Sequence, residues 1–367
     1  MKRVYSYMDT NIDKWEWHIE DTELLNPWFA HFPEHMQNSS IKSNAQRNVF
    51  TVEAKGKKYY IKYSHPASLL QKTRSKVSSK SASEFNSAKL LESAGIPTPK
   101  VIGWGKRGSK SMLMTEAVEN AVNARQFWFS KAVNNPEIQE LFLAKFADFM
   151  KKFFAAKLYH PDFHPGNLLV SKQNETISFI MIDPYGIIEE PSIQSKIFEM
   201  LCILGAFRGE LDDQAGIELI KKIFPDYSDE KCAETWQEIL IAETKKAIRL
   251  WEKRQGRILT DPRDSQVFEQ DGKHIRIRKT FAGELAIDLN SVLEKDETLF
   301  KIQELPPEEA EAKWLESYQW ALHRLPHKLP LAWIKTPNAP DILIREKEHP
   351  TLLGQNEIEK RFKLADL

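Results

Sequence analysis

Apolar and polar residues alternate from Val49 to Glu53 and again from Lys58 to Tyr63, with a Lys-Gly turn between the two runs. This two-residue period predicts a β-hairpin. Apolar residues then recur at three- and four-residue steps over residues 83–94, and the glycine that follows suits a helix end, so a short helix is expected there. Segments 101–104 and 111–116 have the composition of two further strands. The pattern predicts a small, mainly antiparallel β region that carries one helix.

The next part of the chain has a mainly helical pattern. From Pro136 to Phe154, phenylalanine and other apolar residues recur along one helical face, which predicts a long amphipathic helix with that face in the core. Residues 168–170 and 177–182 have the pattern of two short strands joined by a polar turn. Helical character returns from about 193 to 254, and a second hairpin pattern follows at 267–278.

These elements divide the chain into four expected parts. A tryptophan-rich N-terminal extension covers residues 1–36, and its aromatic side chains are expected to pack on the main body. A small β lobe covers 37–118, a helical lobe covers 119–254, and a C-terminal extension without an assigned role covers 255–367. The length of 367 residues fits this division, because it exceeds that of one average domain.

Composition and charge exclude several classes of protein. Apolar residues make up 41% of the chain, and 52 basic residues balance 52 acidic ones, which is typical of a folded protein and gives no general affinity for nucleic acid. Cys202 and Cys232 are too few for a disulfide framework. The sequence contains neither a leader-like segment nor an uncharged apolar run of membrane-spanning length. A cytoplasmic protein is therefore expected.

The segment from His160 to Asn167 carries the strongest chemical signal. It places Asp162 five residues before Asn167, the spacing of a protein kinase catalytic loop, in which the aspartate orients or deprotonates the acceptor hydroxyl and the asparagine binds metal. Asp183 directly follows the second predicted strand of this region, where a carboxylate could join Mg²⁺ to nucleotide phosphates. Phosphoryl transfer is the chemistry that this order favours.

Two residues of the β region complete the pattern. Lys62 lies on the second strand of the first hairpin, where its ammonium could meet the phosphates, and Glu84 lies on the predicted short helix, where it could hold Lys62 by an ion pair. Each residue alone is a weak signal, since exposed lysines and glutamates are common. Their order with Asp162, Asn167 and Asp183 is far more specific.

These segments are open to other interpretations. His160, Asp162 and His164 could form a metal-hydrolase cluster, but Lys62 and Glu84 would then have no role. The segment from 71 to 80 holds four cations and no anion, and it is expected to be a solvated loop or, alternatively, a contact for anionic lipid head groups. A peripheral contact with the membrane surface is part of the second interpretation.

Several of these segments together resemble the bacterial lipopolysaccharide core kinases, which phosphorylate Kdo or heptose with ATP. The resemblance covers about residues 45 to 210. It implies an α+β, bilobal protein-kinase-like fold with a C-terminal extension. It also implies Asp162 as catalytic base, Asn167 and Asp183 as Mg²⁺ ligands, and Lys62 with Glu84 as the phosphate-binding pair. The segments that carry it are Tyr59–Lys62, Ser83–Pro99, His160–Leu169 and Ile182–Asp183.

The resemblance extends to the adenine site and has two departures. Met114–Ala117 resembles the hinge, so Glu116 is expected to contact adenine. No G-x-G-x-x-G precedes the first strand, and Arg47 or backbone N–H groups are expected to cover the phosphates instead. The metal motif contains Pro184-Tyr185 in place of phenylalanine, and no Ala-Pro-Glu follows.

The expected function is therefore that of an ATP-dependent kinase for a sugar hydroxyl of the lipopolysaccharide inner core, with the core glycolipid as partner and a place at the inner face of the inner membrane. Two alternatives remain open. One is a small-molecule kinase of aminoglycoside type, and the other is an inert kinase-like binding module.

Overall fold

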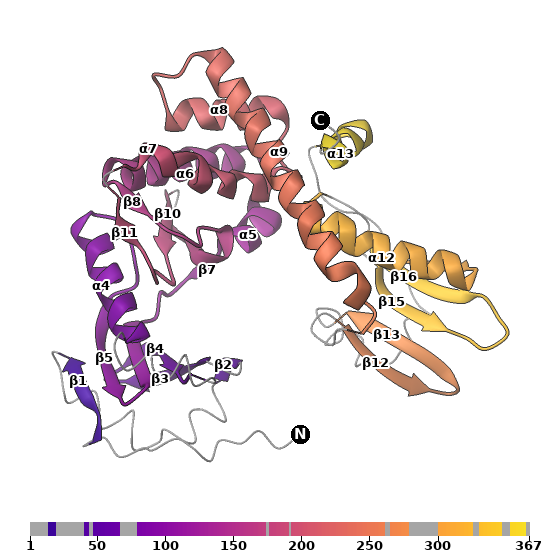
Figure 1. Cartoon of the computed structure of the whole chain (residues 1–367), viewed down its shortest axis with the longest axis horizontal. Helices are drawn as coiled ribbons and strands as arrows, with labels where there is room; N and C mark the ends of the chain where they lie inside the picture. Colours follow the sequence, from indigo (N-terminus) through magenta and orange to yellow (C-terminus); the bar gives the residue numbers. More distant parts are fainter. Residues whose placement is uncertain are drawn as a thin grey trace. The chain divides into compact units, whose positions relative to one another are not determined.

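The computed structural model describes ten stretches of the chain: residues 14–19, 40–43, 47–66, 79–173, 176–190, 192–260, 265–278, 300–325, 330–346 and 353–364. The chain divides into two compact units (Figure 1). The first unit consists of residues 1–130 and 137–200, and the second consists of residues 131–136 and 201–367.

A six-stranded antiparallel sheet forms the first part of unit 1. The first predicted hairpin is confirmed as β3 and β4, and its turn residues Lys55 and Gly56 both have positive φ angles, of 51° and 72°, as a tight hairpin turn requires. The strands, in spatial order, are β1 (Glu16–Ile19), β5 (Val101–Arg107), β6 (Lys110–Glu116), β4 (Lys57–Ser64), β3 (Arg47–Ala54) and β2 (Ser40–Ser43).

The N-terminal extension contributes a strand to this sheet. Strand β1 pairs with β5, and the side chain of Trp15 is buried in the core of the sheet, as expected for an aromatic of the extension. Gly105 on β5 makes this docking possible, because a Cβ atom there would lie only 2.4 Å from the ring of Trp17. The strand itself was not predicted.

Helix α4 (Lys80–Ser93) packs on the sheet. Its Ala88 meets Val101 and Leu113 in a buried cluster. The helix begins three residues before the predicted position, because the side chain of Ser79 accepts a hydrogen bond from a first-turn N–H and caps the helix.

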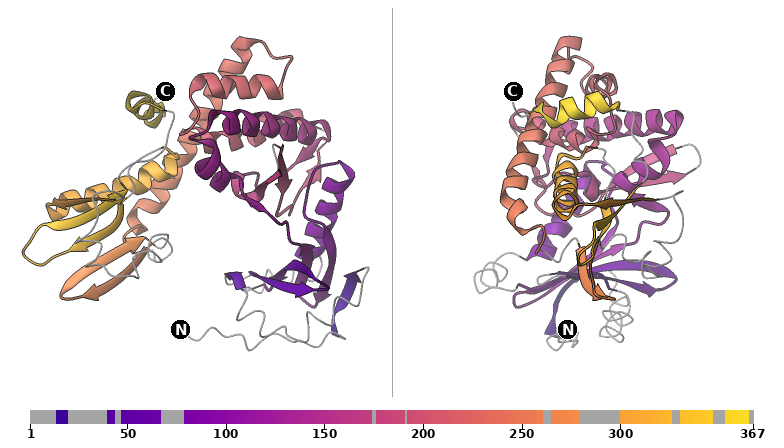
Figure 2. Two further views of the ribbon diagram at one scale, coloured as in Figure 1. Left: turned by 180° about the vertical axis from the view of Figure 1, so that it is seen from behind. Right: turned by 90° about the vertical axis from the view of Figure 1, so that its right-hand side faces the viewer.

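The second part of unit 1 is built on α6 (Pro136–Ala155) and the hairpin of β9 (Leu168–Gln173) and β10 (Thr176–Met181). Helix α6 lies beside this hairpin in both views (Figure 2), and Phe142 meets Phe179 of β10 edge to face, with 4.9 Å between ring centroids. The predicted core role of the phenylalanine stripe is confirmed. The remaining elements are β7 (Ala121–Asn123), α5 (Ala124–Phe127), η3 (Trp128–Ala132), β8 (Leu158–Tyr159), η4 (Pro165–Asn167), β11 (Ile188–Glu189) and α7 (Gln194–Leu201).

Unit 2 joins a helical part to a five-stranded sheet. The hairpin expected at 267–278 is confirmed as β12 and β13, but the other strands of this sheet were not predicted. Trp314 of α12 packs against Trp333 of β15 beneath the sheet. The elements are η5 (Cys202–Phe207), α8 (Asp213–Ile223), α9 (Asp229–Arg254), η6 (Gln255–Arg257), β12 (Ser265–Gln270), β13 (Lys273–Arg278), β14 (Phe300–Leu305), α12 (Pro307–His323), β15 (Pro330–Lys335), β16 (Asp341–Glu346) and α13 (Gln355–Phe362).

The order of elements is that of a protein-kinase-like α+β fold with a C-terminal extension. An antiparallel sheet with one helix precedes a long helix, a loop and a β-hairpin, all in unit 1. In the described part of the chain, no helix combines the length and the apolar character that a bilayer crossing requires.

Candidate active site

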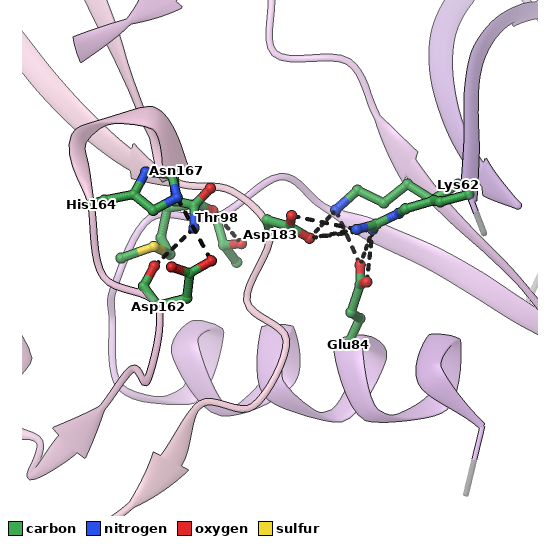
Figure 3. Close-up of polar contacts among 9 residues, drawn as sticks. Lys62, Glu84, Thr98, Asp162, His164, Asn167 and Asp183 are labelled. Atoms are coloured by element: carbon green, nitrogen blue, oxygen red, sulfur yellow. Dashed lines mark hydrogen bonds and ion pairs between the residues drawn. The ribbon is translucent and has the colours of Figure 1, made fainter. Parts of the chain in front are cut away.

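Four charged side chains from separate elements meet beside the sheet of unit 1 (Figure 3). Lys62 of β4 places its Nζ 3.1 Å from Glu84 Oε2 and 3.2 Å from Asp183 Oδ1, so the expected ion pair between Lys62 and Glu84 is present. Arg47, the first residue of β3, donates to Glu84 Oε1 at 2.7 Å and to Asp183 Oδ1 at 3.2 Å. Each cation therefore contacts both carboxylates. These four residues are called the charged cluster below.

Burial makes the charged cluster electrostatically strong. Glu84 is 1% exposed, so its charge is stabilised mainly by the two cations that contact it. Burial would raise the pKa of Asp183, but the charges of Lys62 and Arg47 and their hydrogen bonds hold that pKa well below its usual range. Asp183 is thus an ionised carboxylate, which is the form that binds a divalent cation.

The backbone around Asp183 is held in an uncommon conformation. Asp183 has a φ angle of 57°, in the left-handed region that aspartate tolerates better than most residues. The strand before it is fixed by hydrogen bonds from the N–H of Met181 to Pro97 O at 2.8 Å and from the N–H of Ile182 to Asn167 O at 2.8 Å. The second bond joins the Asp183 segment directly to the predicted catalytic loop, His160 to Asn167.

Within that loop, hydrogen bonds position Asp162 and Asn167. The buried ring of His160 accepts a hydrogen bond from the Asp162 N–H at Nδ1, at 3.0 Å, and Asn167 Nδ2 donates to Asp162 O at 3.0 Å. Burial lowers the pKa of His160, and the nearby Asp162 carboxylate only partly opposes this, in agreement with a neutral ring that accepts at Nδ1. The side chain of Asp162 is 80% exposed and lies 3.7 Å from His164 Nε2.

The oxygen atoms that Asn167 and Asp183 offer as ligands fit Mg²⁺ and not zinc. Because Asn167 uses its Nδ2 for the loop, its Oδ1 is left to join the Asp183 carboxylate as a hard oxygen ligand, and Mg²⁺ commonly takes only one or two such protein ligands beside phosphate oxygens. The described residues contain no group of three or more His, Cys, Asp or Glu that could hold a metal ion. The hydrolase cluster of His160, Asp162 and His164 is therefore not formed.

A cavity of about 340 Å³ opens beside the charged cluster, within the usual size range of ligand sites. Apolar side chains from both parts of unit 1 line it, together with Arg47, Lys62, Asn167 and Asp183. The predicted adenine contact, Glu116, also lies on its wall. The other lining residues are Val49, Tyr60, Ala88, Thr98, Pro99, Val101, Leu113, Thr115, Val118, Ala121, Gly166, Leu169, Ile182 and Pro184.

Backbone hydrogen bonds identify a hinge residue that the sequence interpretation missed. The N–H of Glu116 donates to Lys100 O and that of Ala117 donates to Lys58 O, both at 2.9 Å, so neither is available to a ligand. The N–H of Val118 makes no such bond to any described residue, and Val118 lines the cavity. Val118 is thus the backbone donor left at this edge, with the Glu116 carbonyl as a neighbouring acceptor.

Comparison with known proteins agrees with this geometry. A model of the lipopolysaccharide kinase (Kdo/WaaP) family matches residues 33–184, the segment that contains the charged cluster and the catalytic loop. This segment belongs to the Kdo/WaaP family. The match implies phosphotransfer as the class of reaction for this segment.

The solved structures that are similar to this chain share little sequence identity with it. "WaaP in complex with acyl carrier protein" is 16% identical with a TM-score of 0.45, over 67% of this chain and 100% of that one. A double mutant of the Mycobacterium tuberculosis PknI kinase domain is 16% identical with a TM-score of 0.34, over 55% of this chain and 94% of that one. No curated protein matches the sequence.

A first prediction concerns the charged cluster of the Kdo/WaaP segment. Glu84→Gln leaves two largely buried cations with Asp183 as their remaining carboxylate, so we expect a loss of about 2–4 kcal/mol in the free energy of unfolding, measured in urea. Glu92→Gln on the same helix is the matched control, because Glu92 is exposed and its carboxylate forms a surface ion pair with Lys89, at 2.8 Å. Equal stability of the two variants would contradict the role of the cluster in the fold.

A second prediction concerns the hinge. Val118→Pro removes the N–H left at the cavity edge, and we expect the Kd of ATP to rise about tenfold, as measured by calorimetry. Val118→Ala keeps the N–H and should bind ATP nearly as the wild type does. A similar loss in both variants would show that the side chain, and not the backbone donor, contributes the affinity.

Proposed function

We propose that the protein transfers the γ-phosphoryl group of ATP to a sugar hydroxyl, on Kdo or heptose, of the lipopolysaccharide inner core. The observation that carries the proposal is the convergence of Lys62, Glu84 and Asp183 beside a cavity that Lys62 and Asp183 line, in a segment that matches the lipopolysaccharide kinase family. We further propose a small lobe over residues 37–118 and a helical lobe over 119–254, as expected from the sequence.

Asp162 is proposed to accept the proton of the acceptor hydroxyl. Its carboxylate is largely exposed and therefore accessible to a large acceptor, while its backbone is fixed by His160 and Asn167. As the hydroxyl oxygen attacks the γ-phosphorus, its proton passes to a carboxylate oxygen of Asp162 and ADP leaves. His160 keeps its ring neutral and holds the loop.

The cations of the charged cluster are proposed to bind the nucleotide phosphates. Lys62 and Arg47 both line the cavity, and Glu84 fixes the direction of their side chains. Asn167 Oδ1 and the Asp183 carboxylate would hold Mg²⁺, which neutralises developing charge on the phosphate oxygens when bound. The backbone of Glu116 and Val118 would hold the adenine ring.

An acceptor panel tests this function. Purified protein is incubated with ATP, Mg²⁺ and one of three acceptors: inner-core glycolipid, the same core oligosaccharide without its acyl chains, or an aminoglycoside. Mass spectrometry should find one added phosphate on the glycolipid sugar. Phosphorylation of the aminoglycoside alone would favour the small-molecule alternative, and ATP binding without transfer to any acceptor would favour the inert module.

The site of action is proposed to be the inner face of the inner membrane, reached by peripheral contact. The basic segment that motivated this contact lies at 71–80, and residues 71–78 are outside the described part of the chain. Lys80 is described, and it belongs to helix α4. Co-sedimentation with vesicles that contain inner-core glycolipid, compared with neutral vesicles, would measure this contact.

A further inference from the structure

Three side chains on one face of helix α4 are linked, directly or through other side chains, to the segment that follows β10. Lys80, Glu84 and Ser87 are spaced four and three residues apart, so they lie on the same side of the helix. Glu84 is joined to Asp183 through Lys62 and Arg47, and Ser87 Oγ donates to Ile187 O at 3.2 Å. Lys80 completes the row, because its Nζ lies 4.9 Å from the centroid of the Tyr185 ring.

The contacts of Lys80 and Ser87 both fall on the turn that directly follows Asp183. Pro184 is buried and fixes one backbone angle between Asp183 and Tyr185, so the position of the tyrosine ring is transmitted to the aspartate over a short, stiff connection. The N–H of Ile187 closes the turn by donating to Pro184 O at 3.2 Å. Gly186, with a φ angle of 82°, permits that turn.

The ring contact suits this place better than an ion pair would. Lys80 interacts electrostatically with all four members of the charged cluster, and burial followed by the charge of Arg47 lowers its pKa. Among the described residues, no carboxylate lies within ion-pair distance of Lys80. A carboxylate in place of Tyr185 would compete with Asp183 for Lys62 and Arg47, whereas an aromatic ring attracts the ammonium without adding a negative charge.

We propose that Lys80 and Tyr185 form a clasp that positions Asp183 relative to Lys62 and Glu84, and that the clasp sets how well the site couples Mg²⁺ to ATP. This inference rests on the function proposed above. Tyr185 is 47% exposed, so substitution of its ring should leave the core unchanged. Lys80 and Tyr185 act through Asp183 and are positioning residues.

Four variants separate the clasp from general stability. Lys80→Met and Tyr185→Leu remove the cation and the ring, whereas Lys80→Arg and Tyr185→Phe keep them. For the first two, we expect the Kd of ATP in the presence of Mg²⁺ to rise about 3- to 30-fold, with the Kd in EDTA unchanged. The conservative pair should remain near the wild type. Thermal unfolding should stay within about 2 °C of the wild type in all four.

A double-mutant cycle and hydrogen exchange sharpen the test. If Lys80 and Tyr185 act only through their contact with each other, the double variant Lys80→Met, Tyr185→Leu should raise the Kd of ATP with Mg²⁺ no more than either single variant does. In the ligand-free protein, amide exchange over residues 182–188 should become faster in the Met and Leu variants and not in the Arg and Phe variants.

Three outcomes would overturn the clasp. They are unchanged Mg²⁺ dependence in the Met and Leu variants, an equal loss in Tyr185→Phe and Tyr185→Leu, and fully additive losses in the double variant. Since the main readouts are binding and exchange, they remain valid if the wild type transfers no phosphate. A wild type that transfers no phosphate would contradict the proposed function, not the clasp.

Discussion

Asp162→Asn is expected to slow phosphoryl transfer by about 10²–10⁴-fold while the Kd of ATP stays within about twofold. The amide keeps the shape of the carboxylate but cannot accept the acceptor proton. The side chain is 80% exposed, and the hydrogen bonds that fix the loop use the Asp162 backbone, so the fold should persist. Single-turnover transfer to the glycolipid and calorimetry of ATP measure the two quantities.

The control for this variant is an exposed carboxylate outside the site. Glu140→Gln on the outer side of α6 makes the same chemical change without touching the loop. It should transfer at the wild-type rate. Transfer by Asp162→Asn within a few-fold of this control would exclude Asp162 as the base.

Asp183→Asn is expected to have the second large effect. An amide is a weaker ligand for Mg²⁺, so we expect transfer to fall by about 10²–10⁴-fold and the Mg²⁺ concentration for half-maximal activity to rise. Asp183→Glu keeps the charge but shifts its position, and should lose less. A titration of activity against Mg²⁺ for the three proteins measures this, and an unchanged Mg²⁺ requirement in Asp183→Asn would contradict the assignment.

The pH dependence of activity on the acidic side provides a related prediction, because Asp183 must be ionised to bind Mg²⁺. Lys62 and Arg47 hold the pKa of Asp183 below its usual range, so this carboxylate stays ionised as the pH falls through the range where an ordinary aspartate is protonated. By linkage, its contribution to stability is present above the unfolded-state pKa of about 3.9 and is lost only as the pH falls toward the depressed folded-state pKa. A fall in activity between about pH 5 and 7 would therefore arise from another group.

The order of the predicted elements was sufficient to bring Lys62 and Glu84 together. Lys62, Glu84 and Asp183 lie far apart in the chain, yet each follows from a local rule: a strand position, a helix position and the end of a buried strand. Because the order of these elements fixes how they pack, the ion pair between Lys62 and Glu84 could be expected from the sequence alone. Arg47 was expected near phosphates, but its contacts with Glu84 and Asp183 depend on side-chain direction, which spacing does not reveal.

Other features could not be predicted because they depend on long-range pairing. Strand β1 has only four residues, and its place beside β5 depends on Gly103 and Gly105. Gly103 admits the backbone of β1, and Gly105 admits the ring of Trp17. Val118 was missed because which hinge N–H is available depends on which neighbours are already bonded. Lys80 was counted with a basic loop, since the capping role of Ser79 is visible only once the helix is formed.

The C-terminal extension illustrates the same limit. Its first hairpin was predicted from local alternation, but the sheet is completed by β15, β16 and β14, and the pairings of β13 with β15 and of β14 with β16 join segments that are far apart in the sequence. Single strands of this kind carry too few residues for a specific local signal. Trp314 and Trp333 become a core only when α12 and β15 meet.

Whether the protein transfers phosphate to a core sugar through Asp162 can be measured by following the γ-phosphate itself. ATP labelled at the γ-phosphate is incubated with Mg²⁺, inner-core glycolipid and either the wild type or Asp162→Asn, and the label is measured on the glycolipid sugar. We expect label on the sugar with the wild type and almost none with the variant, although both bind ATP. Equal labelling by the two proteins, or ATP binding by the wild type without any label on the sugar, would contradict this expectation.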